Sequence, residues 1–188
     1  MDTMRYQKEL TRLGAYDVVV AGGGPSGICA AVAAARQGAK TALLERYGIV
    51  GGNLTSGCVG PIMGSVSSGT MRDELTALLG VQANDMLGFA GFVHDIEQAK
   101  RALVRFLDEE GVQLYLQTPV IDVMMDQHRV TELVVGSKKG PALIAAKTFV
   151  DATGDGDVAC YAGAAYDEGR KQDLRVQPPR NKPRRHPR

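Results

Sequence analysis

The sequence predicts an α/β fold, in which a parallel sheet carries a small antiparallel β-meander as an insertion. Three observations predict this fold. Residues 16–45 show a buried strand, a glycine-rich turn, an Ala-rich helix and a second strand, in that order. Short strands separated by turns fill about 118–147, as in a meander. A second Gly- and Asp-rich cluster follows another apolar strand at 148–157.

The first unit opens on an apolar, β-branched run at 16–21, which is the pattern of a strand buried on both faces. The next six residues, 22–27, fit the spacing G-x-G-x-x-G. We expect Gly22 to permit the tight turn out of the strand. We expect Gly24 to let the backbone approach a pyrophosphate, and Gly27 to let the helix pack against the strand.

The helix predicted over 28–37 ends at Gly38, a typical C-terminal glycine. Its N-terminus offers free N–H groups and a positive dipole end to phosphates. A second strand covers 40–44, and Glu45 at its end can accept hydrogen bonds from an adenosine ribose. This order predicts a Rossmann-like dinucleotide-binding unit. The alternative is a glycine-rich turn in an α/β protein without a ligand.

The middle of the chain predicts loops and two helices. Paired glycines at 51–52 permit close approach of the backbone to a ligand, and a short helix or turn follows at 53–57. Residues 58–70 predict a loop that can hold a short strand, and leucines at helical spacing predict a helix over 71–79.

The best amphipathic helix covers 95–110 and ends at Gly111. Its polar face offers two i,i+4 ion pairs, Glu97 with Arg101 and Arg105 with Glu109. The residues that we expect on its apolar face are Ile96, Ala99, Leu103, Phe106 and Leu107.

Short strands follow this helix, and the last three of them form the predicted meander. A further strand at 148–150 returns to the parallel sheet, and the turn at 152–154 leaves it. Asp157 is expected to N-cap a helix over 158–162. The short strands are predicted at 112–116, 120–125, 130–135 and 142–145, with hairpin turns at 127–129 and 136–140.

Composition suits one domain of 188 residues, 44% of them hydrophobic. The polar start, 1–14, lacks the pattern of a signal peptide, and the apolar stretch 18–35 is broken by Gly and Pro, so no membrane span is predicted. Three scattered cysteines suit a reducing cytoplasm. The net charge is +1, but all six charged residues from Arg175 onward are basic, and half of the prolines also lie there.

Three stretches, 20–27, 44–53 and 150–159, together resemble the FAD-dependent oxidoreductase family. Within the glutathione-reductase-like superfamily, the resemblance is to the branch related to heterodisulfide reductase. It covers about residues 14–177 and implies the N-terminal, FAD-binding part of a longer oxidoreductase. The domains expected are a lead-in at 1–15 with a helical turn or two, an FAD-binding domain at 16–174 with the meander at about 118–147, and a basic, Pro-rich, disordered tail at 175–188.

The resemblance also implies which residues contact FAD. The first glycine loop holds the pyrophosphate, and the acid after the second strand holds the ribose. The paired glycines flank the flavin, the start of the meander reaches adenine through its backbone, and the third loop closes over the pyrophosphate. The cofactor-binding residues expected are Gly22, Gly24, Pro25, Ser26, Gly27, Glu45, Arg46, Gly51, Gly52, Asn53, Val120, Thr153, Gly154 and Asp155.

Cysteine usage departs from this family. Related disulfide reductases place a redox cysteine pair after the paired glycines, whereas this loop has Cys58 alone, with Leu54 near the other position. We therefore expect no dithiol relay. Cys58 is expected to be a small packed residue, with a lone reactive thiol as the alternative, and packing is expected more strongly for Cys29 and Cys160. Part of the wider family carries a 4Fe-4S cluster, but three scattered cysteines do not supply a Cys₄ site.

No residue stands out as a catalytic acid, base or nucleophile. His94 and His128 fall at a predicted helix start and a hairpin turn. Asp155 and Asp157 fit phosphate-loop and N-cap roles better than a metal site, because no further ligand lies nearby in the sequence. Flavin would carry the redox chemistry itself. The substrate, the electron donor and the oligomeric state are not predicted.

Two other functions compete with FAD binding. The first is an NAD(P)-binding dehydrogenase domain, because Glu45 suits NAD as well as FAD; neither the paired glycines at 51–52 nor the turn at 152–154 is needed for NAD. The second is attraction of nucleic acid or an anionic membrane by the basic tail. That tail contains no aromatic residue to stack on bases, so nucleic acid is not expected as a partner.

Overall fold

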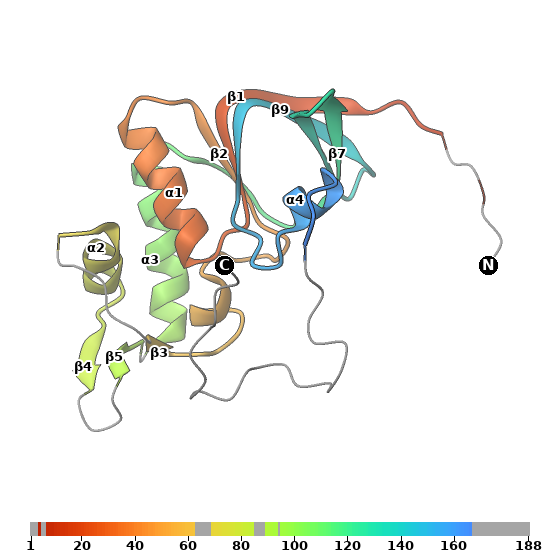
Figure 1. Cartoon of the computed structure of the whole chain (residues 1–188). Helices are drawn as coiled ribbons and strands as arrows, with labels where there is room; N and C mark the ends of the chain where they lie inside the picture. The colour runs from red at the N-terminus through yellow and green to blue at the C-terminus, as the bar shows by residue number, and fades with distance from the viewer. Residues whose placement is uncertain (1–3, 5–6, 63–68, 85–88, 94, 167–188) are drawn as a thin grey trace, which may run out of the picture.

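A six-stranded sheet separates α1, α2 and α3 from α4 in the computed structural model of the chain (Figure 1), and this arrangement confirms the predicted α/β fold. The structure describes residues 4, 7–62, 69–84, 89–93 and 95–166. The predicted tail at 175–188 and His94 lie outside the described residues.

The sheet is mixed, with the strand order β6-β2-β1-β9-β8-β7. Four neighbouring strands, β6, β2, β1 and β9, run parallel to one another. β8 pairs antiparallel with β9, and β7 pairs antiparallel with β8. The parallel sheet and the antiparallel meander are therefore both present, as predicted. The strands are β1 (Thr11–Ala21), β2 (Thr41–Leu44), β6 (Gln113–Tyr115), β7 (Val120–Asp126), β8 (Arg129–Val135) and β9 (Ala142–Asp151).

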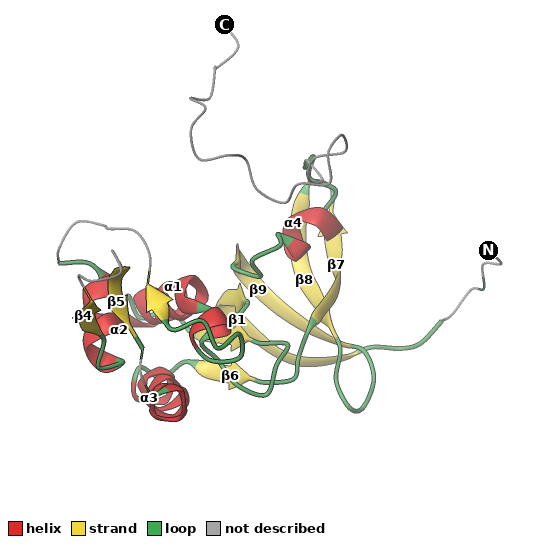
Figure 2. Cartoon of the chain, turned by 90° about the horizontal axis from the view of Figure 1, so that it is seen from below, coloured by secondary structure: helices red, strands yellow, loops and turns green. Residues whose placement is uncertain are grey.

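The helices lie on opposite faces of this sheet (Figures 1 and 2). Three pack on one face, together with a small antiparallel sheet of order β3-β5-β4, and α4 packs against β7 and β9 on the other. These elements are α1 (Pro25–Arg36), α2 (Met71–Leu78), α3 (Ile96–Glu109), α4 (Asp157–Tyr161), β3 (Pro61–Ile62), β4 (Gln82–Asn84) and β5 (Phe89–Phe92), with a short 3-10 helix at Gly52–Leu54.

Side chains of β1 alternate between the two faces of the sheet, and each face has its own hydrophobic core. Val20 points toward the three helices and is fully buried against Ile28 and Leu103. Val19 points the other way and is fully buried with Leu133 of the meander. Burial on both faces explains the near-continuous apolar run at the end of β1.

The main correction to the predicted strands concerns β9. The strands predicted at 142–145 and 148–150 are one strand, Ala142–Asp151. It pairs antiparallel with β8 over its first half and parallel with β1 over its whole length. The meander therefore extends the parallel sheet directly. Because β1 pairs with the whole length of β9, it begins at Thr11, within the predicted lead-in. Strand there replaces the expected helical turns.

The predicted amphipathic helix is confirmed as α3, with four of its five expected apolar residues buried. The side chain of Asp95 caps its N-terminus by accepting from the backbone N–H of Gln98 at 2.8 Å. The predicted pair between Glu97 and Arg101 is wrong, since Glu97 instead contacts Lys100 at 2.7 Å, one residue closer along the same face. The second predicted pair, between residues 105 and 109, is present at 3.2 Å.

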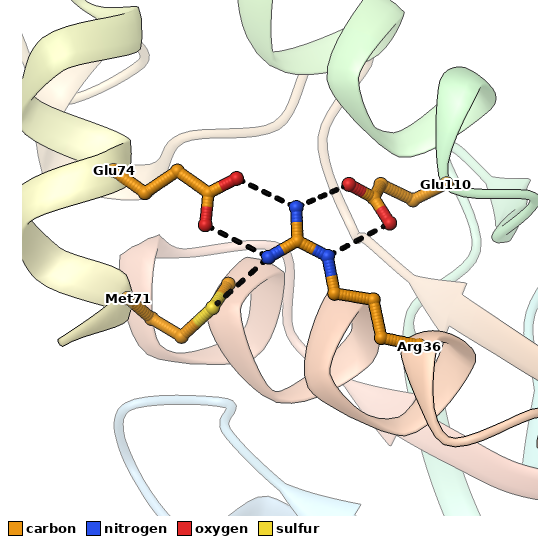
Figure 3. A network of polar contacts seen from close by, with 4 residues as sticks. All are labelled: Arg36, Met71, Glu74 and Glu110. Carbon is orange, nitrogen blue, oxygen red and sulfur yellow. Dashed lines mark hydrogen bonds and ion pairs between the residues drawn. The ribbon is translucent and has the colours of Figure 1, made fainter. Parts of the chain in front are cut away.

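Arg36, the last residue of α1, joins all three helices on its side of the sheet (Figure 3). Its guanidinium donates to both carboxylate oxygens of Glu74 in α2, at 2.8 and 2.6 Å. It also donates to both carboxylate oxygens of Glu110, the C-cap residue of α3. These contacts raise the pKa of Arg36 and lower the pKa of both glutamates. Bidentate pairing of this kind fixes geometry as well as charge.

Replacement of Arg36 should destabilise this junction in a pH-dependent way. Both glutamates have folded-state pKa values below the ordinary 4.5, so their pairing stabilises the fold above that pH and is lost as the pH falls through the folded-state values. Arg36→Met should therefore lower the urea midpoint at pH 7, and the difference from wild type should shrink below pH 4.5. Arg105→Met, which removes an exposed pair on α3, is the control. A difference that stays constant with pH would contradict the assignment.

Candidate dinucleotide-binding site

The predicted site residues gather where the parallel strands end. The loops after β1, β2, β6 and β9 leave the sheet at the same edge, because these strands are parallel neighbours in register. This edge is where open α/β sheets bind ligands. Backbone contacts then join the four loops to one another.

The glycine turn after β1 packs directly against the loop after β9. Gly22 has a φ of +103°, and a Cβ there would lie 2.2 Å from the carbonyl oxygen of Ala152. A Cβ on Gly27 would lie 1.9 Å from the carbonyl oxygen of Gly22. The roles predicted for these two glycines, a tight turn and close helix packing, therefore have a direct steric basis.

Gly24 is different, because no described atom lies within 4 Å of the position that its Cβ would take. It is the N-cap residue of α1, with ordinary extended backbone at a φ of −71°. Within α1, which is described in full, no side chain caps the N-terminus and no acidic residue lies in the first turn. The positive end of the helix dipole therefore meets open space beside Gly24, an arrangement suited to an anion. Pro25 begins the helix and Ser26 is exposed.

The paired glycines contact the first glycine turn. The backbone N–H of Gly51 donates to the carbonyl oxygen of Gly23 at 2.7 Å. A Cβ on Gly52 would lie 3.1 Å from the Cα of Gly24, and a Cβ on Gly51 would lie 2.5 Å from Thr55. Gly52 is thus required by a contact between loops and Gly51 by a contact within its own loop, reasons that the motif did not reveal. Their approach to a ligand stays a prediction.

Glu45 contacts the loops after β1 and β6 as well as its own loop after β2, and it is only 5% exposed. One carboxylate oxygen accepts from the backbone N–H of Gly23 and the other from that of Tyr47, each at 2.8 Å. Its own backbone N–H donates to Tyr115 at 2.9 Å, and its carbonyl oxygen accepts from Thr118 at 2.8 Å. Glu45, the expected ribose acceptor, therefore lies beside the glycine turn. Its hydrogen bonds with backbone groups were not predicted from the sequence.

The other residues expected near the adenosine and flavin are spread around Glu45. Arg46 is exposed, with its guanidinium 5.0 Å from the centroid of the Tyr47 ring. Val120 begins β7, two residues beyond Thr118. Asn53 is exposed in the 3-10 helix that begins at the second of the paired glycines. The structure therefore brings together the glycine turns and Glu45, with these residues at the margin.

The loop after β9 is held by its own hydrogen bonds. The hydroxyl of Thr153 donates to Asp151 at 2.8 Å and accepts from the backbone N–H groups of Gly156 and Asp157. The predicted N-cap role of Asp157 is therefore wrong. Gly156, with a φ of +76°, is the N-cap of α4, and the Thr153 hydroxyl accepts the hydrogen bonds from the first N–H groups of this helix. The other two loop residues expected to contact FAD, Gly154 and Asp155, are exposed.

Two of the three cysteines are not packed as expected. Cys58 is exposed on a turn with a φ of +52°, and its Sγ lies 3.6 Å from the carbonyl oxygen of Thr55. Cys160 is also exposed, on the outer face of α4. Cys29 packs against the helix-side core, and burial raises its pKa.

Across the described ranges, no three His, Cys, Asp or Glu side chains gather in a way that could hold a metal ion. The same ranges contain no helix long and apolar enough to span a membrane.

The family follows from comparison with known proteins. Residues 17–185 match the family described as FAD dependent oxidoreductase. The chain belongs to this family. Thiamine thiazole synthase from Methanococcus aeolicus is 34% identical over 154 residues, which cover 77% of this chain and 57% of that protein. Soluble pyridine nucleotide transhydrogenase from Chromohalobacter salexigens is 29% identical and matches 74% of this chain and 30% of its own.

Solved structures agree with the fold. THI4 from Thermovibrio ammonificans superposes with a TM-score of 0.61 at 25% identity, over 78% of this chain and 61% of that one. A geranylgeranyl bacteriochlorophyll reductase-like protein from Thermoplasma acidophilum gives a TM-score of 0.58 at 21% identity, over 80% of this chain and 42% of its own. The chain spans 56–65% of the length of the thiazole synthases that it matches. The predicted family is confirmed, whereas its heterodisulfide-reductase-related branch stays a prediction.

Alanine substitutions at Gly27 and Gly24 should distinguish a glycine that packing requires from a glycine that lies beside open space. Gly27→Ala should lower the free energy of unfolding by about 2 kcal/mol or more, because overpacking costs about 1–3 kcal/mol and the added carbon meets backbone. Gly24→Ala should cost less than about 1 kcal/mol, the scale of changing an N-cap residue. Urea unfolding of the ligand-free proteins measures both. Equal losses for the two variants would show that the space beside Gly24 is not open.

Proposed function

We propose that this chain binds FAD and forms the part of a longer oxidoreductase that holds the adenosine diphosphate half of the cofactor. The observation that carries the proposal is the open space beside Gly24, at the uncompensated N-terminus of α1. Family membership supports FAD as the dinucleotide. The hydride or electron chemistry is supplied by the flavin when it is bound.

The residues fit the adenosine diphosphate half. In this proposal Gly24, Pro25 and Ser26 place backbone N–H groups and the helix dipole beside the pyrophosphate, with Gly22 and Gly27 shaping the turn. Glu45 has a carboxylate beside the same turn and accepts from ribose hydroxyls through its remaining lone pairs.

The outer residues complete the proposed site. Val120 offers its backbone to adenine, since β7 begins two residues beyond a direct contact with Glu45. Arg46 extends the adenosine side. Thr153 lies against the first glycine turn, and in this proposal the residues at 153–155 close over the pyrophosphate. Gly52 lies next to Gly24, and the segment at 51–53 is proposed to face the flavin.

The domain division that we propose keeps an FAD-binding domain over 16–174, extended at its start by the strand at 11–15, after a short lead-in. The basic tail at 175–188 is proposed as a separate segment because of its charge and proline content. A cytoplasmic location is supported by the scattered cysteines.

Two narrower functions can be proposed within the family. A role like that of the thiazole synthases is supported by 34% identity to the M. aeolicus enzyme and by the superposition on THI4. A role in the branch related to heterodisulfide reductase is supported by the three sequence motifs alone. Growth without thiamine of a thiazole-synthase-deficient strain that expresses this chain would favour the first; reduction of a disulfide substrate would favour the second.

The binding proposal is tested by enlarging Gly24. The purified chain should take up FAD and show flavin absorbance, and Gly24→Val should abolish uptake because its branched side chain fills the pyrophosphate space. Ala77→Val, on the exposed face of α2, is the control and should bind as wild type does.

Retention of FAD by Gly24→Val at the wild-type ratio would show that the pyrophosphate lies elsewhere. Uptake of NAD or NADP in preference to FAD by the wild-type chain would instead favour the dehydrogenase alternative.

A further inference from the structure

The backbone of Gly23 is held from both ends by neighbouring loops. Its N–H donates to the Glu45 carboxylate at 2.8 Å, and its carbonyl oxygen accepts from the N–H of Gly51 at 2.7 Å. Gly23 itself is buried. Gly24, with the open space beside it, is the next residue. The two hydrogen bonds on Gly23 therefore fix the direction in which the turn presents Gly24.

The room for the carboxylate is made by the absence of a side chain on Gly23. A Cβ there would lie 2.9 Å from the nearer carboxylate oxygen of Glu45 and 2.9 Å from Val50. The other carboxylate oxygen accepts from Tyr47, so the side chain is anchored on the turn and on its own loop at once. These hydrogen bonds of the Glu45 carboxylate are formed in the ligand-free chain.

We propose that Glu45 is a positioning residue that holds the glycine turn in its ligand-binding shape, apart from any contact with a ribose. The effect that we propose on ligand binding rests on the proposed function. The effect on the shape of the turn rests on the geometry of the ligand-free chain. A carboxylate suits this task because both of its oxygens accept, and here they face two backbone donors.

Glutamine is the informative replacement. It has nearly the same shape, but its amide has one oxygen, so its NH₂ group must face the second backbone donor. One N–H is left without an acceptor in a buried place, which is costly. Glu45→Gln should therefore loosen the turn while leaving the core unchanged. Glu109→Gln, an exposed change on α3, is the matched control for loss of one charge.

Amide hydrogen exchange of the ligand-free 188-residue chain tests the clamp directly. The Gly23 amide should be protected in wild type. In Glu45→Gln the amide of Gly23 or of Tyr47, whichever faces the NH₂ group, should exchange faster by about tenfold or more, the scale of losing one charge-assisted hydrogen bond. Glu109→Gln should leave the exchange of both amides unchanged. Free exchange of the Gly23 amide in wild type would overturn the proposal without the need for any variant. Unaltered protection of both the Gly23 and the Tyr47 amide in a folded Glu45→Gln would also overturn it.

Binding of ADP and of 2′,3′-dideoxy-ADP separates positioning from ribose contact. A positioning role predicts that Glu45→Gln weakens binding of dideoxy-ADP, which lacks both ribose hydroxyls, by about tenfold, and that it weakens binding of ADP at least as much. A loss for ADP alone, with dideoxy-ADP unaffected, would overturn the proposal in favour of a ribose contact only. A wild-type chain that binds neither nucleotide contradicts the proposed function, and the exchange measurement alone then decides the role of Glu45.

Discussion

The close contact between the glycine turn after β1 and the backbone of Ala152 after β9 sets the geometry of the whole ligand-binding edge. The two strands pair in parallel up to Ala21 and Asp151, and the N–H of Ala152 then donates to Ala21 at 2.8 Å. The two loops consequently leave the sheet together. Only glycine fits at Gly22 and Gly27, because a Cβ at either position would overlap backbone atoms.

The start of α1 follows from this contact. Because the turn is tight, the helix begins within four residues of the end of β1, and its N-terminus stays at the sheet edge. The far end of the same helix carries Arg36, which joins α2 and α3. Fully buried side chains such as Ile28 and Val32 hold the helix between these two ends. One helix thus connects the candidate site to the packing of its whole side of the sheet.

Features decided within a short stretch could be predicted from the sequence. The glycine motif, the Ala-rich helix, the acid after β2 and the amphipathic α3 all depend on neighbours a few residues away. Features decided by distant partners could not. β9 is one strand because β1 pairs with it along its whole length, and no local pattern carries that information. The short break that suggested two strands, at 146–147, lies beyond the pairing with β8 and is kept in the strand by β1.

The candidate site shows the same division. The spacing identified Glu45 as a polar residue at the ligand edge, but not the two backbone donors that its carboxylate meets. The paired glycines at 51–52 suggested a ligand, and in the structure they also meet Thr55 and Gly24. Cys58 was expected inside on the basis of residue type, yet the turn that follows the 3-10 helix leaves it at the surface. Contacts within and between the folded loops account for these differences, and sequence spacing does not encode them.

Recognition of FAD through its adenosine diphosphate half is the central claim. Competition against bound FAD by ADP and by FMN, followed through flavin fluorescence, tests it most directly. We expect ADP to displace FAD and FMN to leave it bound, because the glycine turns, Glu45 and the loop after β9 surround the proposed place of the pyrophosphate and adenosine. Displacement by FMN without displacement by ADP would contradict this claim.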